Sequence, residues 1–338
     1  MINICVVGAG IIGLSTAVVI QQKYGSAVSV TLIADKFSPN TTGDGAAGLW
    51  GPYLLGDTPH EKIRIWSEAT HDFLESLWKS EDAGRLGISL IPCYRVNVEV
   101  EPLPAWKNTV YGFREMPDKE IQKIGRPGLR QGISFVTYIC ECSKFLPYLL
   151  EEFRKNRGNV VEQTIKNWAQ LVDTYDIIVD CSGIRARDLA GDRSVAPKRG
   201  QVMRVTAPWI KAVILDDSDD GNYVIPNMDS VVLGGTHQEG DWNMNIYPED
   251  TQFILEGCQR LVPALKHVPV QREWVGLRPG RPSVRLDREV VRVKNRKVTV
   301  IHNYGHGGSG VTLFWGCAKE AADLVGEALS SKLLKSRL

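Results

Sequence analysis

The chain has 338 residues, a formal net charge of +1, 43% hydrophobic residues and 23% charged residues. This length suits one large domain or two closely joined ones, and the composition is that of an ordinary globular protein. The near-zero charge provides no field for nucleic acid, and no apolar stretch is long enough to cross a bilayer, so neither partner is expected.

Seven cysteines are present, an odd number: Cys5, Cys93, Cys140, Cys142, Cys181, Cys258 and Cys317. Most lie in apolar contexts, which is typical of reduced, buried thiols in an intracellular protein. Cys140 and Cys142 form the one close pair, and no further ligands occur at a matching spacing. We therefore expect no metal site.

The first thirty-five residues predict a dinucleotide-binding unit. An apolar run at 4–7 leads into Gly8-Ala9-Gly10-Ile11-Ile12-Gly13, a helical stretch follows at 14–20, and a β-rich run at 28–33 ends at Asp35. Strand, G-x-G-x-x-G, helix, strand and acid is the arrangement that binds an adenine dinucleotide. The alternative is a glycine-rich turn in an α/β domain that binds no nucleotide.

Each glycine of this pattern, and the acidic residue after it, has a physical role. Gly8 permits the tight turn, Gly10 lets the backbone approach a pyrophosphate, and Gly13 lets the helix pack closely on the strand. The pyrophosphate is expected at the helix N-terminus, where unpaired N–H groups favour an anion. Asp35 can accept hydrogen bonds from the ribose hydroxyls.

The rest of the chain alternates between segments of two kinds. A Gly/Pro-rich loop at 36–60 precedes a helix at 63–79. Strands at 88–100 and 109–113 precede a helix at 145–157, and a buried strand follows at 176–183. Short β-rich runs at 199–205, 222–226 and 230–236 precede a helix at 249–261, a strand at 297–303, a glycine-rich turn and a helix at 311–329.

The nucleotide-binding parts are therefore scattered along the chain. We predict an α/β fold with a discontinuous Rossmann-like domain of residues 1–50, 155–195 and 295–338. Residues 51–154 and 196–294 are predicted to build a second domain with a mixed β-sheet that binds substrate or forms an interface. A split unit with glycine turns near both ends suits FAD better than NAD, because FAD must be held at both of its ends.

Several motifs along nearly the whole chain resemble those of D-amino-acid oxidases and the related D-aspartate oxidases, with the closer likeness to the former. They are VVGAGIIGLST at 6–16, DGAAGLW at 44–50, RGQV at 199–202, GLRP at 276–279 and HNYGHGG at 302–308. Together these motifs are far more specific than the nucleotide-binding pattern alone.

The resemblance implies FAD held without a covalent bond. It places Asp35 and Lys36 at the AMP ribose, Ile165 at the adenine, and the turn 307–312 around the flavin. The full set of implied cofactor residues is Gly8, Ala9, Gly10, Ile11, Ile12, Gly13, Asp35, Lys36, Thr41, Thr42, Ala47, Gly48, Leu49, Ile165, Ser182, Gly183, Arg278, Gly307, Gly308, Ser309, Gly310, Val311 and Thr312.

The resemblance also implies the substrate site. Arg278 is expected to bind the substrate carboxylate, since a guanidinium fork is always charged and binds carboxylates bidentately. Tyr223 is expected to donate to the same carboxylate, and the Gly308 carbonyl to accept from the substrate amine. Leu49, Leu215 and Ile225 are expected to form apolar walls. For Arg278 and Tyr223 the alternatives are a structural ion pair and half-buried packing.

The chain departs from the family at the short acidic segment 216–220. Vertebrate D-amino-acid oxidases have a longer lid with a second tyrosine there, so a more open pocket is expected. D-aspartate oxidases hold the acidic side chain with arginines, where this chain has Leu215, Asp216 and His237. Four aspartates near the entrance should repel acids. The sequence therefore favours neutral D-amino acids, with basic ones as a further option, and D-aspartate oxidase as the alternative.

The implied reaction is hydride transfer from the substrate α-carbon to flavin N5. It consumes O₂ and yields H₂O₂, and water hydrolyses the imino acid to a 2-oxo acid and ammonia. No side-chain acid or base is required, so a structural role is expected for His306. Other readings are a glycine or sarcosine oxidase, an NAD(P)-dependent dehydrogenase and a nucleotide-sensing module without turnover. The final Ser336-Arg337-Leu338 resembles a peroxisomal address, with the cytoplasm as the alternative. The family suggests a homodimer.

Overall fold

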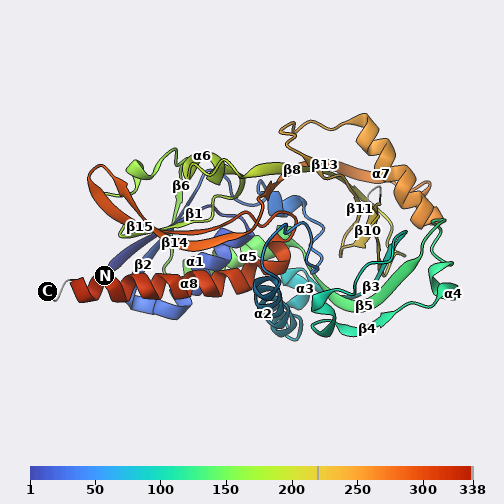
Figure 1. The fold of residues 1–338 in the computed structure, drawn as a ribbon, viewed down its shortest axis with the longest axis horizontal. Coiled ribbons are helices and arrows are strands. Elements are labelled where there is room, and N and C mark those ends of the chain that lie inside the picture. Colours follow the sequence, from blue (N-terminus) through green and yellow to red (C-terminus); the bar gives the residue numbers. More distant parts are fainter. Residues whose placement is uncertain (219–220, 336–338) are drawn as a thin grey trace.

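A six-stranded sheet forms one end of the molecule, and the opening glycine turn follows its central strand (Figure 1). The computed structural model describes residues 1–218 and 221–335. The strand order is β14 (Arg285–Val293), β15 (Arg296–Tyr304), β7 (Ile177–Asp180), β1 (Ile2–Val7), β2 (Val28–Ala34) and β6 (Asn159–Glu162). All neighbours are parallel except β14, which is antiparallel to β15. The parallel strands end at one common edge, where ligands bind in such folds.

Long helices cover one face of this sheet. They are α1 (Ile11–Tyr24), α5 (Cys142–Lys155) and α8 (Gly310–Lys335), and α2 (His60–Trp78) packs on α8. Ile11 and residues 13–21 of α1 are buried, because the helix is enclosed by the sheet, α5 and α8. This explains why apolar residues lie around its whole circumference rather than on one stripe.

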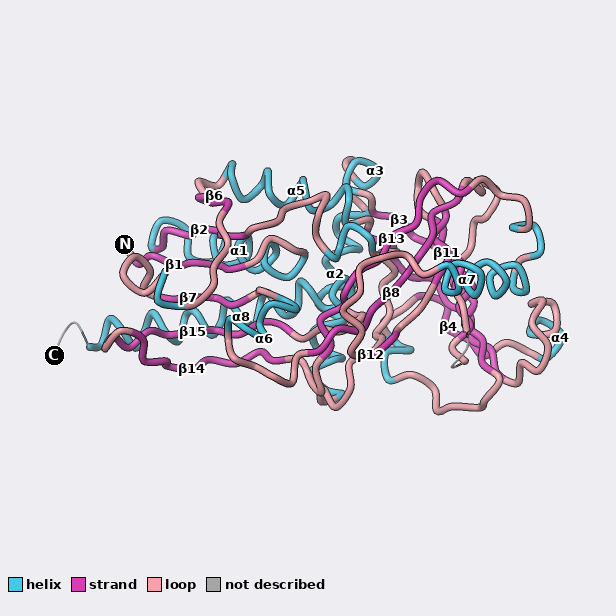
Figure 2. The backbone as a smooth tube through the Cα atoms, turned by 90° about the horizontal axis from the view of Figure 1, so that it is seen from above, coloured by secondary structure: helices cyan, strands magenta, loops and turns pink. Residues whose placement is uncertain are grey.

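The second sheet is mixed and lies at the other end of the molecule (Figure 2). Its order is β12 (Gln238–Glu239), β8 (Ala196–Val205), β11 (Val231–Gly234), β10 (Tyr223–Pro226), β9 (Val213–Asp216), β3 (Ile88–Asn97), β5 (Gln131–Cys140) and β4 (Tyr111–Glu115). A ninth strand, β13 (Val270–Gly280), also pairs with β8. Only β3 and β9 are parallel, and α7 (Pro248–Leu261) packs on β8 and β11. The short helices α3 (Ala83–Leu86), α4 (Asp118–Ile121) and α6 (Ala186–Leu189) complete the fold.

The predicted fold class, a Rossmann-like unit plus a second sheet, is confirmed. One boundary differs from the proposed division, which put residues 196–294 in the second domain. β14 lies in the first sheet, because Lys294 and Asn295 both adopt positive φ and fold it back on β15 as a tight hairpin. One large buried cluster, which includes Ile4, Trp50 and Phe135, joins the two sheets.

All seven cysteines are buried, and none forms a disulfide. Burial raises the pKa of every one of these thiols. Within residues 1–218 and 221–335, no cluster of histidine, cysteine or acidic side chains could hold a metal ion. No helix in the same part of the chain is long and apolar enough to cross a membrane.

Candidate active site

A cavity of about 460 Å³ is lined by residues of both sheets. This volume lies in the range of small-molecule and cofactor sites. The β1–α1 turn and the start of α8 form one part of its wall, and β8, β10 and β13 contribute to the opposite part. The cavity therefore brings together segments that are far apart in the sequence.

The three glycines of the opening turn have different surroundings. A Cβ on Gly8 would lie 2.4 Å from the Cys181 carbonyl oxygen, and one on Gly13 would lie 1.8 Å from the Gly8 carbonyl oxygen. A Cβ on Gly10 would meet no atom within 4 Å, and Gly10 lines the cavity. Gly8 and Gly13 thus permit the packing, while Gly10 leaves space beside the N-terminus of α1.

Many of the predicted cofactor residues share this wall: Gly10, Ile11, Ile12, Gly13, Thr42, Ala47, Gly48, Leu49, Gly183, Arg278, Gly307, Gly308, Gly310 and Val311. Two further residues of the wall, Asn303 and His306, have a buried polar atom without a partner in the described chain, Oδ1 and Nε2 respectively. The residues present fit a large polar cofactor such as FAD, because they offer two helix N-termini, unpaired polar atoms and open space beside Gly10.

Other predicted cofactor residues lie off this wall: Gly8, Ala9, Asp35, Lys36, Thr41, Ile165, Ser182, Ser309 and Thr312. Asp35 forms an ion pair with Arg185, which also donates to the Ile165 carbonyl at 3.4 Å. These three residues follow β2, β7 and β6, so they gather at the carboxyl edge of the first sheet. This is where the resemblance places the AMP part of the cofactor.

Several of these side chains are engaged inside the protein. Ser309 Oγ accepts from the Tyr53 amide at 2.6 Å, and Thr312 Oγ1 accepts from the Gly51 amide at 3.1 Å. Ser182 donates to Asp180 at 2.6 Å, and Asp44 accepts from the Thr41 hydroxyl at 2.7 Å. Their side chains therefore shape the loops around the cavity.

Arg278 reaches the cavity from β13 and lies across β8. A Cβ on Gly200 would lie 2.2 Å from Arg278 Nη1, so the glycine makes room for the guanidinium. Nη1 donates to the Thr236 carbonyl at 2.9 Å. No carboxylate in residues 1–218 or 221–335 pairs with Arg278. A positive charge with spare donors on a cavity wall is suited to bind an anion.

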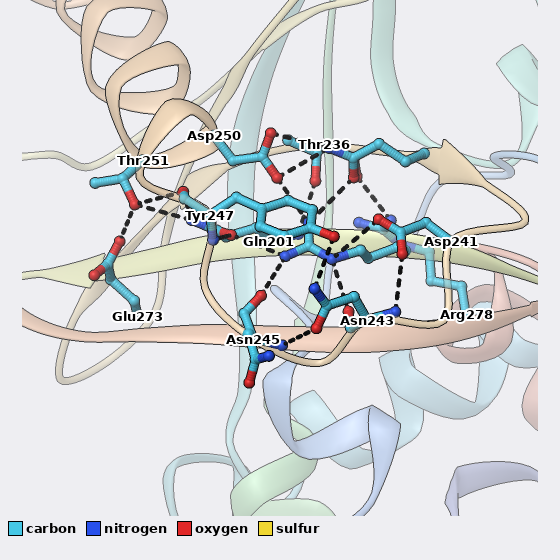
Figure 3. A network of polar contacts seen from close by, with 12 residues as sticks. Gln201, Thr236, Asp241, Asn243, Asn245, Tyr247, Asp250, Thr251, Glu273 and Arg278 are labelled. Carbon is cyan, nitrogen blue, oxygen red and sulfur yellow. Dashed lines mark hydrogen bonds and ion pairs between the residues drawn. The ribbon is translucent and has the colours of Figure 1, made fainter.

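A buried polar network holds the loop that carries Thr236 (Figure 3). The Gln201 amide donates to Thr236 Oγ1 at 2.9 Å. Arg199, whose side chain is wholly buried, donates to Asp250 at 2.7 Å and to Gln201 Oε1 at 3.2 Å. It also donates to two carbonyls of the loop, those of residues 243 and 245, and stacks on the Tyr247 ring. The network therefore fixes Thr236, whose carbonyl orients Arg278.

Tyr223 lies beside Arg278 at the start of β10. Its ring fits because Gly234 has no side chain, since a Cβ there would lie 2.1 Å from Tyr223 Cζ. Burial raises the pKa of Tyr223, and the nearby Arg278 charge only partly opposes this shift. The hydroxyl is therefore protonated at neutral pH and can donate to a carboxylate.

The expected apolar residues Leu49, Leu215 and Ile225 all line the cavity. Tyr53, which was not among the predicted residues, lies in the wall and packs on Gly308: a Cβ on Gly308 would be 2.5 Å from Tyr53 Cδ1. The segment 216–218 supplies no lid tyrosine, but the loop before α2 supplies Tyr53 to the cavity wall instead. No pattern around Gly51-Pro52 in the sequence could have indicated it.

The expectation of four free carboxylates near the entrance needs correction. Asp216 forms an ion pair with Arg126, and Asp217 forms one with Arg95. Asp219 and Asp220 lie outside the described residues. Arg95 reaches this place because β3 runs parallel to β9, with Arg95 opposite Leu215. Sequence spacing alone gives no sign of this long-range pairing.

His306 is buried in the glycine-rich turn at the cavity wall. Burial lowers its pKa from 6.5 to about 3. The imidazole is therefore neutral at physiological pH and a weak base.

Comparison with known proteins places this geometry in a family. The model of FAD-dependent oxidoreductases matches residues 3–324. Human D-aspartate oxidase is 41% identical over 99% of both chains, and D-amino acid oxidase of Dugesia ryukyuensis is 38% identical over 99% of this chain and 100% of its own. Glycine oxidase of Geobacillus kaustophilus has the same fold, with a TM-score of 0.76 over 97% of this chain and 95% of its own, at 16% identity.

The cofactor of this family is FAD, which argues against an NAD(P)-dependent dehydrogenase. The match extends over both sheets, and two relatives above 35% identity cover nearly the full chain. The chain therefore belongs to the family of FAD-dependent oxidoreductases that includes the D-amino-acid and D-aspartate oxidases.

Proposed function

We propose that this enzyme oxidises D-amino acids with neutral side chains, and also basic ones, to 2-oxo acids, ammonia and H₂O₂. The observation that carries the proposal is Arg278, a cavity-lining guanidinium without a carboxylate partner in the described chain, beside the protonated Tyr223 hydroxyl. This pair suits a substrate carboxylate, and the same cavity contains the glycine turns that fit FAD.

The proposed roles follow from the chemistry of each group. Arg278 and Tyr223 bind the carboxylate, and the Gly308 carbonyl accepts from the amine. Leu49 and Leu215 exclude water from the α-carbon. When bound, FAD supplies the hydride acceptor and passes electrons to O₂. Fixing both carboxylate and amine orients the α-hydrogen of one enantiomer only, so orientation replaces acid–base catalysis.

The test is a peroxide-coupled assay of the purified yellow protein with D-alanine and L-alanine. Peroxide from D-alanine alone is the expected result. A protein that carries flavin but oxidises no D-amino acid would overturn the proposal, and oxidation of N-methylglycine in preference to D-alanine would assign a sarcosine-type activity instead.

D-aspartate oxidase is the second candidate. Two observations favour it: the 41% identity to the human enzyme of that name, and Arg95 in the cavity wall. No arginine occupies positions 215, 216 or 237, where the resemblance expects one, and Arg95 already pairs with Asp217. Faster turnover of D-aspartate than of D-alanine would reverse the choice of substrate.

We also propose a peroxisomal location and a homodimeric assembly. The first is supported by Ser336-Arg337-Leu338, which lies outside the described residues, and the second by the family alone. Deletion of Leu338 should move a fluorescent fusion from peroxisomes to the cytoplasm. Sedimentation of the purified protein would give the assembly state.

A further inference from the structure

A second cavity of about 210 Å³ adjoins the first. The two share four wall residues, namely Pro52, Arg95, Trp106 and Asp217. The rest of its wall comes from Val96 and Asn97, from residues 101–104, and from Gln131 and Ile133 on β5. Because the four shared residues line both cavities, the second cavity lies next to the first one on the side of Asp217.

Pro52 and Tyr53 connect the carboxylate-binding residues to this second cavity. Tyr53 lines the first cavity, and its neighbour Pro52 lines both. A substrate side chain that extends from Arg278 past Pro52 toward Asp217 would reach the second cavity.

The charged groups of the second cavity carry a negative excess. Arg95 pairs with one oxygen of Asp217 and lies over the Trp106 ring, while the other oxygen of Asp217 accepts no bond from the described residues. Glu101 contributes a further carboxylate without an ion pair in residues 1–218 or 221–335. Asp216 is occupied by Arg126 and by Ser218. His237, exposed and on the first cavity only, is the remaining titratable group on this side.

The acidic residues are held in place by their backbones. The Asp217 amide donates to the Val96 carbonyl at 2.8 Å. The Glu101 amide donates to Gln131 Oε1 at 2.9 Å, and Gln131 Nε2 donates back to the Glu101 carbonyl at 2.8 Å. The backbones of both acidic residues are therefore fixed by hydrogen bonds, although both residues lie in connecting segments.

We propose that the second cavity is the distal side-chain subsite of the substrate pocket and takes long cationic D-amino acids, with Asp217 and Glu101 receiving the charged end. This inference depends on the proposed oxidase function. D-lysine and D-arginine have the required reach and charge. An acidic side chain would put a third carboxylate beside one guanidinium, whereas a cation balances the two that are present.

The experiment compares D-lysine, D-arginine, D-glutamate and D-norleucine, which matches the length of lysine without its ammonium group. In the wild-type enzyme, kcat/KM for D-lysine and D-arginine should exceed that for D-norleucine and D-glutamate. Asp217→Asn should lower the ratio of D-lysine to D-norleucine about tenfold, and Glu101→Gln about threefold, in line with the loss of one charged contact. Ratios within one variant cancel any general loss of active enzyme.

Glu99→Gln is the matched control, since Glu99 is exposed and lines neither cavity. It should leave the ratio unchanged. If Asp217→Asn does not fold, the exposed Glu101→Gln decides the question. Oxidation of D-alanine without any preference for D-lysine over D-norleucine, or a preference that both variants retain, overturns the subsite alone. A flavin-loaded protein inactive on every D-amino acid overturns the oxidase function itself.

Discussion

At one end of the active-site cavity, Arg278 and Tyr223 lie on strands β13 and β10 of the second sheet, and a buried polar network backs them. At the other end, Asp217 and Glu101 lie in connecting segments. Arg199, behind the first end, is completely buried, while the Arg95 and Asp217 side chains are 26% and 22% exposed. The rigid end suits the α-carboxylate that all amino acids share. The looser end suits the part that differs between substrates, because loop residues can change without disturbing a sheet.

The largest effect should come from a change that removes the cofactor, because activity on every substrate is then lost. Gly10→Val places its side chain in the open space beside the α1 N-terminus, without a clash inside the protein. The variant should fold but lose FAD, as seen from its flavin absorbance and a native circular dichroism spectrum. Gly84→Val, at an uncrowded position away from the cavity, should stay yellow. A yellow Gly10→Val protein would contradict the placement of the dinucleotide.

Arg278→Ala should affect every substrate alike. Loss of the guanidinium should lower kcat/KM by about 10³-fold for D-alanine and D-lysine, because the carboxylate loses a charge-assisted pair, while FAD stays bound. Steady-state kinetics with flavin spectra measure both. A loss of kcat/KM confined to one of the two substrates would mean that Arg278 contacts the substrate side chain rather than the carboxylate.

Asp250→Asn tests whether the rigid end depends on its buried network. The change removes the nearer of the two carboxylates paired with the buried Arg199, since Asp241 lies farther away at 3.7 Å, and should lower the free energy of unfolding by about 3 kcal/mol. Denaturant titration gives this value. Asp82→Asn breaks the exposed pair with Arg85 and should leave the midpoint nearly unchanged. Equal effects of both variants would remove the contrast between buried and exposed ion pairs.

His306, in the glycine-rich turn of the cavity wall, should make the stability of the protein depend on pH. Its pKa is 6.5 when unfolded and about 3 when folded, so below pH 6.5 the unfolded chain binds a proton that the folded one excludes. Stability should therefore fall as the pH drops from 6.5 toward 3, by about 1.4 kcal/mol at pH 5.5. His306→Gln should flatten this limb of the stability curve, and the exposed His60→Gln should not.

The smallest effect is expected at the looser end. Arg95→Gln removes the cation that pairs with Asp217 and should raise the ratio of kcat/KM for D-lysine to that for D-norleucine about threefold. The same assay should show a lower rate with D-glutamate relative to D-norleucine. A higher rate with D-glutamate relative to D-norleucine would contradict this prediction, because it would mean that Arg95 does not attract an acidic substrate side chain.

The sequence predicted features that depend on local pattern. The β1–α1 turn, the helices α2, α5, α7 and α8, and the strands β7 and β15 follow from apolar periodicity and glycine spacing. Arg278 and Tyr223 became candidates through the resemblance, since a lone strand arginine or tyrosine has no local signal. β5, β13 and β14 were not predicted, because their patterns depend on which sheet they join.

The parts of the site that sequence reasoning missed all depend on long-range pairing. Arg95 meets Asp217 only because β3 and β9 run parallel in register. Tyr53 reaches the wall because the turn before α8 holds its loop through Ser309. The ion-pair partners of Asp216 and Asp217 therefore cannot be predicted from the segment 216–220 alone. Because both residues are paired with arginines, the expected repulsion of acidic substrates was overestimated for them.

The burial of all seven thiols has a consequence for the proposed oxidase, which would release H₂O₂ beside its own active site. The thiolate is the form that attacks peroxide, and a raised pKa together with exclusion from solvent keeps these sulfurs protonated and out of reach. Such a catalyst can turn over many times without sulfenic acid formation eroding its own fold. Peroxide would then oxidise exposed methionines such as Met228 and Met244 before it oxidised any cysteine.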